Sequence, residues 1–116
     1  MSKARRSTSE KGSIGEDTAA AHLALQGYRI LQRNVRLPGG EIDLVCLDGA
    51  TLVFVEVKSR SKAGFGSALH AVDARKRATL RRLAADYAQI VAPTARYRFD
   101  VVALDGERIV LHRNAF

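Results

Sequence analysis

A carboxylate and a lysine stand two residues apart at the end of an apolar run. Leu52 to Val55 is typical of a strand buried on both faces, and it continues without a turn residue into Glu56, Val57 and Lys58. Because side chains alternate along a strand, Glu56 and Lys58 point to the same side. A charge at the end of a buried strand is costly unless it is paired or bound to a metal. Alone, the tripeptide is more typical of a structural ion pair than of a catalytic site.

A second carboxylate, Asp43, comes from the preceding predicted strand. The segments Glu41 to Leu47 and Thr51 to Lys58 are expected to form a hairpin around the turn Asp48-Gly49. Asp43 then lies either directly opposite Glu56 or diagonal to it, depending on the loop length. Both registers put the two carboxylates on one face, with Cβ atoms roughly 5 to 8 Å apart, whereas a three-residue loop would separate them. The other face is expected to receive Ile42, Leu44 and Cys46.

Two carboxylates at this separation repel each other, and a divalent cation relieves that repulsion at neutral pH. Since the ligands are oxygen atoms, Mg²⁺ or Mn²⁺ is favoured over zinc. Such an ion lowers the pKa of water and neutralises charge on a phosphate under attack. Lys58, on the same face, could orient or deprotonate the water or stabilise the developing negative charge.

Two predicted helices flank these strands and contribute one charged residue each. The first is expected over Gly15 to Gln26, with Ser13 as N-cap, and its phase turns Glu16 toward the sheet. A glutamate at a helix start is equally often a cap. In the second, from about 69 to 90, Lys76 lies at the centre of the apolar stripe. Lys76 either extends to solvent or reaches the edge of the site and contacts a phosphate.

The remaining segments complete an α-β-β-β-α-β-β order, which predicts an α/β domain with a mixed sheet. The first strand is expected over 28–37, with an irregularity at Gln32-Arg33, and the last two over 96–104 and 107–112. The last hairpin resembles the first one but has no Glu-x-Lys. Asp100 is therefore interpreted as the partner of a neighbouring arginine and not as a second catalytic aspartate.

The chain is basic and small. Its 116 residues suffice for one core, and 19 Lys and Arg against 12 Asp and Glu give a net charge of +7. This balance favours polyanionic partners. Residues 1–12 are expected to be a disordered basic tail and 13–116 the domain. A basic rim beside the site is expected from Arg60, Lys62, Arg75 and Lys76, although charge runs are more often a solvated face.

Location is indicated by what the sequence does not contain. No stretch approaches the ~20 apolar residues of a membrane span, and no apolar segment follows the basic start. The single cysteine, Cys46, can form no intramolecular disulfide, and the histidines are scattered. The expected location is therefore the cytoplasm, with no membrane partner.

Taken together, the motifs carry a family resemblance. Gly40 to Leu44, followed by Val53 to Arg60, resembles the YraN family of small bacterial proteins. That family is similar to the PD-(D/E)xK, or restriction-endonuclease-like, nuclease superfamily, including archaeal Holliday-junction resolvases. This sequence has Ile42 where the superfamily's name has proline. The likeness covers nearly the whole chain and extends to Gly15-Glu16, Phe65-Gly66, Lys76, Arg98-Phe99-Asp100-Val101 and Asn114-Ala115-Phe116.

The resemblance implies roles for individual residues. Asp43 and Glu56 would be the metal carboxylates, joined by the main-chain carbonyl of Val57, and Lys58 would be the catalytic lysine. Glu16 would complete the site from the first helix, through a water molecule. The metal would be Mg²⁺ or Mn²⁺, and the core would be restriction-endonuclease-like.

Two functions from different classes follow. The first is a metal-dependent endonuclease that hydrolyses phosphodiester bonds in DNA, with branched or structured DNA as the substrate implied by the resemblance. The second is a non-catalytic nucleic-acid-binding module with a nuclease-like fold, in a DNA repair or uptake complex. The joint presence of a carboxylate pair, a lysine and a helix glutamate favours the enzyme. Junction-cutting enzymes are commonly symmetric dimers, so a homodimer is compatible with this function.

Overall fold

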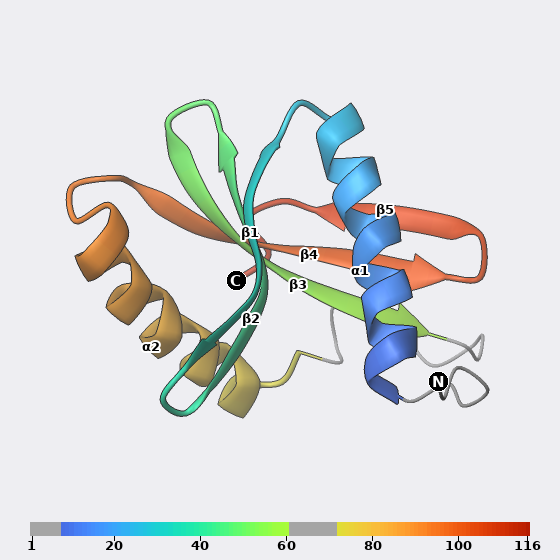
Figure 1. Ribbon diagram of the computed structural model, residues 1–116, viewed down its shortest axis with the longest axis horizontal. Coiled ribbons are helices and arrows are strands. Elements are labelled where there is room, and N and C mark those ends of the chain that lie inside the picture. Colours follow the sequence, from blue (N-terminus) through green and yellow to red (C-terminus); the bar gives the residue numbers. More distant parts are fainter. Residues whose placement is uncertain (1–7, 61–71) are drawn as a thin grey trace, which may run out of the picture.

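The computed structural model describes residues 8–60 and 72–116, and their order of elements confirms the predicted α/β class. A helix, three strands, a second helix and two strands follow one another along the chain (Figure 1). The elements are α1 (Thr8–Leu25), β1 (Arg29–Leu37), β2 (Gly40–Asp48), β3 (Thr51–Arg60), α2 (Ala74–Val91), β4 (Tyr97–Asp105) and β5 (Arg108–His112). Neither helix is long and apolar enough to cross a membrane, within the part of the chain described.

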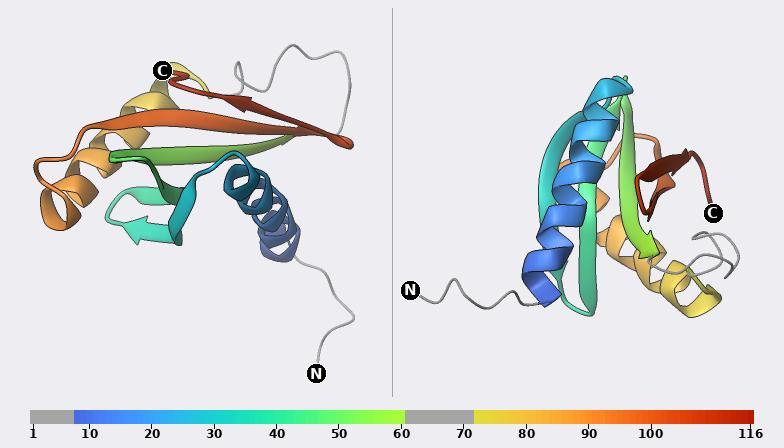
Figure 2. Two further views of the ribbon diagram at one scale, coloured as in Figure 1. Left: turned by 90° about the horizontal axis from the view of Figure 1, so that it is seen from above. Right: turned by 90° about the vertical axis from the view of Figure 1, so that its right-hand side faces the viewer.

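The five strands form one mixed sheet in the order β1-β2-β3-β4-β5. Neighbouring strands are antiparallel except β3 and β4, which are parallel because α2 connects them as a crossover. The two helices lie on either side of the strands, as the right-hand view of Figure 2 shows. The central strand β3 is therefore covered on both faces, which explains its nearly continuous apolar sequence.

Each helix covers its own hydrophobic cluster. On the α2 face, Leu52 and Phe54 of β3 pack with Leu83. On the α1 face, Val53 and Val55 pack with Leu23. The alternation of β3 side chains thus divides the core into two halves, and Glu56 belongs by the same alternation to the α2 half.

The two hairpins share one turn geometry. Asp48 pairs with Thr51, and Asp105 pairs with Arg108, so each hairpin has a two-residue loop that starts with glycine. Gly49 has a φ of 63° and Gly106 a φ of 62°, as a type II′ turn requires at its first central residue. The loop of the first hairpin is Gly49-Ala50, not Asp48-Gly49 as expected. Continued to Asp43, its register would place Asp43 opposite Glu56, but the pairing ends at Leu44 and Val55. Strand β1 does contain an irregularity, but the register shifts between Ile30 and Gln32, just before the expected position at Gln32-Arg33.

Both helices begin away from their predicted starts. Helix α1 begins at Thr8, not at Gly15, so Ser13 is not its N-cap and the helix includes residues 8–12. Glutamate and lysine at positions 10 and 11 are good helix formers, and a glycine inside a helix costs only about 1 kcal/mol. Helix α2 begins at Ala74, because the Asp73 carboxylate accepts a hydrogen bond from the Lys76 N–H at 2.9 Å and caps the first turn. Residues 1–7 and 61–71 lie outside the described residues.

Candidate metal centre

Asp43 lies where the pairing of β2 with both of its neighbours is interrupted. On the β1 side, Arg33 pairs with Leu44 and Val35 with Ile42, while Asn34, opposite Asp43, is not paired. Asn34 adopts a left-handed backbone conformation with a φ of 53°. This conformation is uncommon for residues other than glycine and is best tolerated by asparagine and aspartate.

On the β3 side the pairing ends at Leu44 and Val55, one residue before Asp43 and Glu56 would meet. The Asp43 carboxylate takes over part of the lost pairing, since its Oδ2 accepts a hydrogen bond from the Val57 N–H at 2.8 Å. The sheet therefore opens at Asp43, and the side chain lies between the separating strands.

This interruption overturns one expectation. Leu44 and Cys46 pack with the α1 cluster, but Ile42 packs with the α2 cluster and not on the face of Leu44. The strict two-residue alternation that predicts a common face for these residues holds only in a regular strand. The irregular backbone around Asp43 turns Ile42 to the opposite side.

Glu56 is buried and only partly paired. The residue is 5% exposed, and its Oε2 lies 3.6 Å from the Lys76 Nζ. Its Oε1 has no hydrogen-bond partner among the described residues. A buried carboxylate oxygen without a partner is unfavourable, because it has lost water and gained nothing in exchange.

The electrostatic environment of Asp43 is unfavourable to its charge as well. Burial raises the pKa of Asp43 from its ordinary value of 3.8 to about 7, and the nearby Glu56 carboxylate adds to this rise. The Val57 N–H and the Lys76 ammonium act in the opposite direction but do not cancel it. At neutral pH the pocket therefore resists carrying both negative charges, which is the condition that a bound cation relieves.

Two further glutamates surround Asp43. One carboxylate oxygen from each of Glu16, Glu41 and Asp43 lies within 4.8 Å of the others. Burial raises the pKa of Glu16, with smaller contributions from Asp43 and Glu41, while a hydrogen bond from the Asn34 side chain lowers it. The structure thus brings together three residues that the sequence analysis proposed, Glu16, Asp43 and Glu56.

Glu41 was missed as a site residue by the sequence analysis. It was treated only as the first residue of a strand, although it lies two positions before Asp43. In a regular strand, residues at this spacing share one face. This two-residue spacing could have identified Glu41 as a site residue, since it places a second carboxylate beside Asp43.

The lysines occupy different positions relative to this cluster. Lys58 lies two residues after Glu56 on β3 and is half-buried, and its role in the site stays a prediction. Lys76 reaches Glu56 from α2, so its side chain contacts the site and does not simply extend to solvent. Val57 donates its N–H to Asp43, and a role for its carbonyl as a metal ligand stays a prediction.

The expected basic rim is described only in part. Arg75 is exposed in the first turn of α2, next to Lys76. Arg60 is the last residue of β3, and its side chain lies outside the described residues, as does all of Lys62. Contacts of this rim with nucleic acid stay a prediction.

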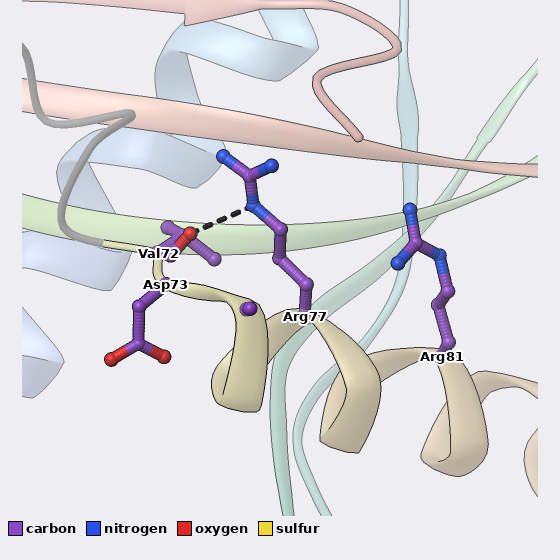
Figure 3. A pocket seen from close by; sticks show the side chains of 5 residues that line it. Val72, Asp73, Arg77 and Arg81 are labelled. Atoms are coloured by element: carbon purple, nitrogen blue, oxygen red, sulfur yellow. Dashed lines mark hydrogen bonds between the residues drawn. The ribbon is translucent and has the colours of Figure 1, made fainter.

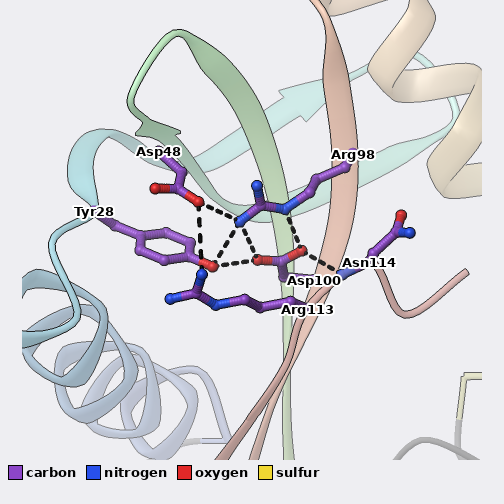
Figure 4. A network of polar contacts seen from close by, with 6 residues as sticks. All are labelled: Tyr28, Asp48, Arg98, Asp100, Arg113 and Asn114. Carbon is purple, nitrogen blue, oxygen red and sulfur yellow. Dashed lines mark hydrogen bonds and ion pairs between the residues drawn. The ribbon is translucent and has the colours of Figure 1, made fainter.

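A second buried carboxylate, Asp100, belongs to a structural network (Figure 4). It is fully buried and accepts hydrogen bonds from the Arg98 Nε at 3.0 Å, the Tyr28 hydroxyl at 2.6 Å and the Asn114 N–H at 2.9 Å. Arg98 also pairs with Asp48 at 2.8 Å. The interpretation of Asp100 as the partner of an arginine is confirmed, and its oxygens are already satisfied.

The family model and the similar proteins that match this chain agree on one family. The chain matches the family described as "Uncharacterised protein family UPF0102" over residues 15–104. A UPF0102 protein of Dechloromonas aromatica is 45% identical over 98% of this chain and 94% of its own length. Another from Moorella thermoacetica is 54% identical over 81% of this chain and 79% of its own length. These matches confirm the resemblance to the YraN family, and the chain belongs to the UPF0102 family.

Proposed function

We propose that this protein is a metal-dependent endonuclease that hydrolyses phosphodiester bonds in DNA. The observation that carries the proposal is the pair of adjoining carboxylates at the opening between β2 and β3. Glu56 is buried, and its Oε1 has no hydrogen-bond partner in the described part of the chain; burial together with Glu56 raises the pKa of Asp43 to about 7. A purely structural ion pair would leave neither feature, because both oxygens would be satisfied.

The available donors fit Mg²⁺ or Mn²⁺. They are carboxylate oxygens together with the main-chain carbonyl of Val57, and these hard cations prefer oxygen ligands of both kinds. Asp43 and Glu56 would hold the ion, with Glu16 and Glu41 contributing directly or through water. When bound, the ion supplies Lewis-acid polarisation of the phosphate and activation of a water molecule.

The lysines have separate tasks in this proposal. Lys58 is two residues beyond Glu56 on the same side of β3, where it orients the attacking water or stabilises charge on the phosphate. Lys76 neutralises Glu56 in the metal-free protein. Once a cation takes over that role, the Lys76 ammonium is available to a phosphate oxygen.

The substrate class follows from charge and resemblance. A net charge of +7 favours a polyanion. The likeness to junction-cutting nucleases favours branched or structured DNA, and a homodimer would match two equivalent strands.

The test combines metal binding with cleavage. Calorimetric titration with Mn²⁺ should show binding to the wild-type protein and its loss in Asp43→Ala and Glu56→Ala. Cleavage of branched, duplex and single-stranded DNA with Mg²⁺ or Mn²⁺ should be abolished in these variants and in Lys58→Ala and Glu16→Ala. Glu107→Gln, which changes an exposed carboxylate in the turn between β4 and β5, is the matched control and should behave as wild type.

The outcomes separate the two functional classes. Metal binding that depends on Asp43 and Glu56, together with cleavage, supports the nuclease. A protein that binds DNA but neither binds Mn²⁺ nor cuts any of the substrates would instead be the non-catalytic binding module.

A further inference from the structure

A solvent-open hollow of about 500 Å³ lies at the start of α2. Its lining includes Arg77 and Arg81, which lie one helical turn apart (Figure 3). The two guanidinium groups extend to the same side of the helix, whereas the Asp73 carboxylate points away from them (Figure 3). The hollow therefore presents two cations to solvent with its one acidic side chain turned elsewhere.

Both arginines are held in place by the same aromatic ring. The guanidinium carbon of Arg77 lies 5.5 Å from the centre of the Phe116 ring, and that of Arg81 lies 5.4 Å from it. The Arg77 Nε also donates a hydrogen bond to the Val72 carbonyl at 2.7 Å. Side chains fixed in this way lose less entropy when they bind a ligand than free surface arginines do.

Phe116 itself is anchored to the core. Its ring stacks on Phe99 at a centroid distance of 4.9 Å, and the Ala115 N–H donates a hydrogen bond to the Phe99 carbonyl at 2.7 Å. The aromatic platform under the two arginines is therefore part of the rigid α2 face of the sheet.

The chemistry of the two arginines indicates the ligand. A cation–π contact with the Phe116 ring uses none of the guanidinium N–H donors, and among the described residues only the Arg77 Nε is engaged, by the Val72 carbonyl. The donors match the oxygens of a phosphate in a bidentate arrangement. A merely structural role, covering the Phe116 ring, would not need two arginines at a hollow.

Charge at the start of α2 supports the same ligand. The first turn contains Arg75, Lys76 and Arg77 and no acidic residue. The Asp73 carboxylate at the N-cap offsets part of the unfavourable interaction between these three cations and the positive end of the helix dipole, and a bound anion would offset more of it.

We propose that Arg77 and Arg81 bind a backbone phosphate of the nucleic acid, next to the phosphodiester bond at the metal centre. The inference rests on the proposed function, because it concerns the substrate of that same site. The first turn of α2 connects the two regions, since Lys76 contacts Glu56 and the next residue, Arg77, lines the hollow.

The test measures binding without metal, so that cleavage plays no part. A fluorescein-labelled branched DNA is titrated with protein in EDTA at several NaCl concentrations, and binding is followed by fluorescence anisotropy. In Arg77→Gln/Arg81→Gln, binding should weaken at every salt concentration. The slope of log K against log [NaCl] should fall in magnitude by about 1, as expected for one lost phosphate contact.

Two comparison variants distinguish a shaped site from charge alone. Arg82→Gln/Arg108→Gln removes the same charge from exposed positions outside the hollow and should change the slope much less. Arg77→Lys/Arg81→Lys keeps the charge but loses the paired N–H donors of the guanidinium group, and it should also bind more weakly than wild type. Circular dichroism verifies that each variant is folded.

The proposal is overturned if Arg77→Gln/Arg81→Gln binds as wild type, or if the control double variant loses as much affinity. These results leave the nuclease proposal intact whenever the wild-type protein cuts DNA. Conversely, binding that depends on the hollow in a protein that cuts no substrate supports the phosphate site and refutes only the nuclease.

Discussion

Replacing Asp43 by asparagine should stabilise the metal-free protein while removing its metal site. The amide oxygen of the introduced asparagine can still accept the hydrogen bond from the Val57 N–H that Asp43 accepts at 2.8 Å. The substitution therefore keeps the geometry and removes the charge that burial and Glu56 make unfavourable. Natural sites often accept such a cost because function requires it.

The size and sign of the change in stability with pH follow from the linkage between proton binding and folding. The pKa of Asp43 is raised from 3.8 to about 7, so the folded state binds this proton more tightly than the unfolded state. The associated stabilisation is complete below the unfolded pKa and is lost as the pH rises through the folded pKa. From below the unfolded pKa to above the folded pKa, the free energy of unfolding falls by an amount on the order of 4 kcal/mol. About 2 kcal/mol of this decrease occurs between about pH 5 and neutrality.

The difference in stability between Asp43→Asn and wild type should therefore grow with pH. Urea unfolding in EDTA, repeated from about pH 5 to about pH 8, measures it directly. Asp105→Asn, at an exposed strand end, is the matched control and should track the wild type at every pH. Adding Mn²⁺ near pH 8 should stabilise the wild type but not Asp43→Asn.

A difference that does not change with pH would refute the reasoning. It would mean that the Asp43 charge is not opposed by its surroundings, and the main physical ground for a cation between the carboxylates would disappear. A wild type that is more stable than Asp43→Asn near neutral pH would have the same consequence.

Three other substitutions address separate parts of the molecule. Lys76→Gln removes the cation that now pairs with Glu56, so calorimetry should show tighter Mn²⁺ binding even though cleavage slows; unchanged or weaker metal binding would contradict this. Asp100→Ala leaves Arg98 and the Tyr28 hydroxyl without their buried partner, and chemical unfolding should show a loss of about 3 to 5 kcal/mol. Leu83→Ala opens a cavity in the α2 cluster and should cost about 2 to 5 kcal/mol, with cleavage per folded molecule retained.

The parts of the site that follow regular strand geometry could be predicted from the sequence. The parity of the hairpin register predicts that Asp43 and Glu56 come close together, and the Glu56 carboxylate does raise the pKa of Asp43. Helical phase likewise turned Glu16 toward the sheet. Such rules need no knowledge of the rest of the fold.

The parts of the site that depend on irregular backbone could not be predicted from the sequence. Nothing in the local pattern signals that Asn34 adopts a left-handed conformation or that Ile42 changes face. The start of α2 depended on a single capping contact from Asp73. The support of Arg77 and Arg81 by Phe116 joins segments far apart in the chain, and only the packed structure reveals it.

The opening of the sheet at Asp43 explains how both helices reach one site. In an uninterrupted sheet, a residue from α1 and a residue from α2 would be separated by the strands between them. Because pairing is lost on both sides of Asp43, Glu16 approaches its carboxylate from α1 while Lys76 approaches the adjoining Glu56 from α2. The lost pairing weakens the sheet locally, and the hydrogen bond from Val57 replaces only part of it. The same interruption that costs stability is therefore what gathers charged residues from two faces, which is typical of strain retained at functional sites.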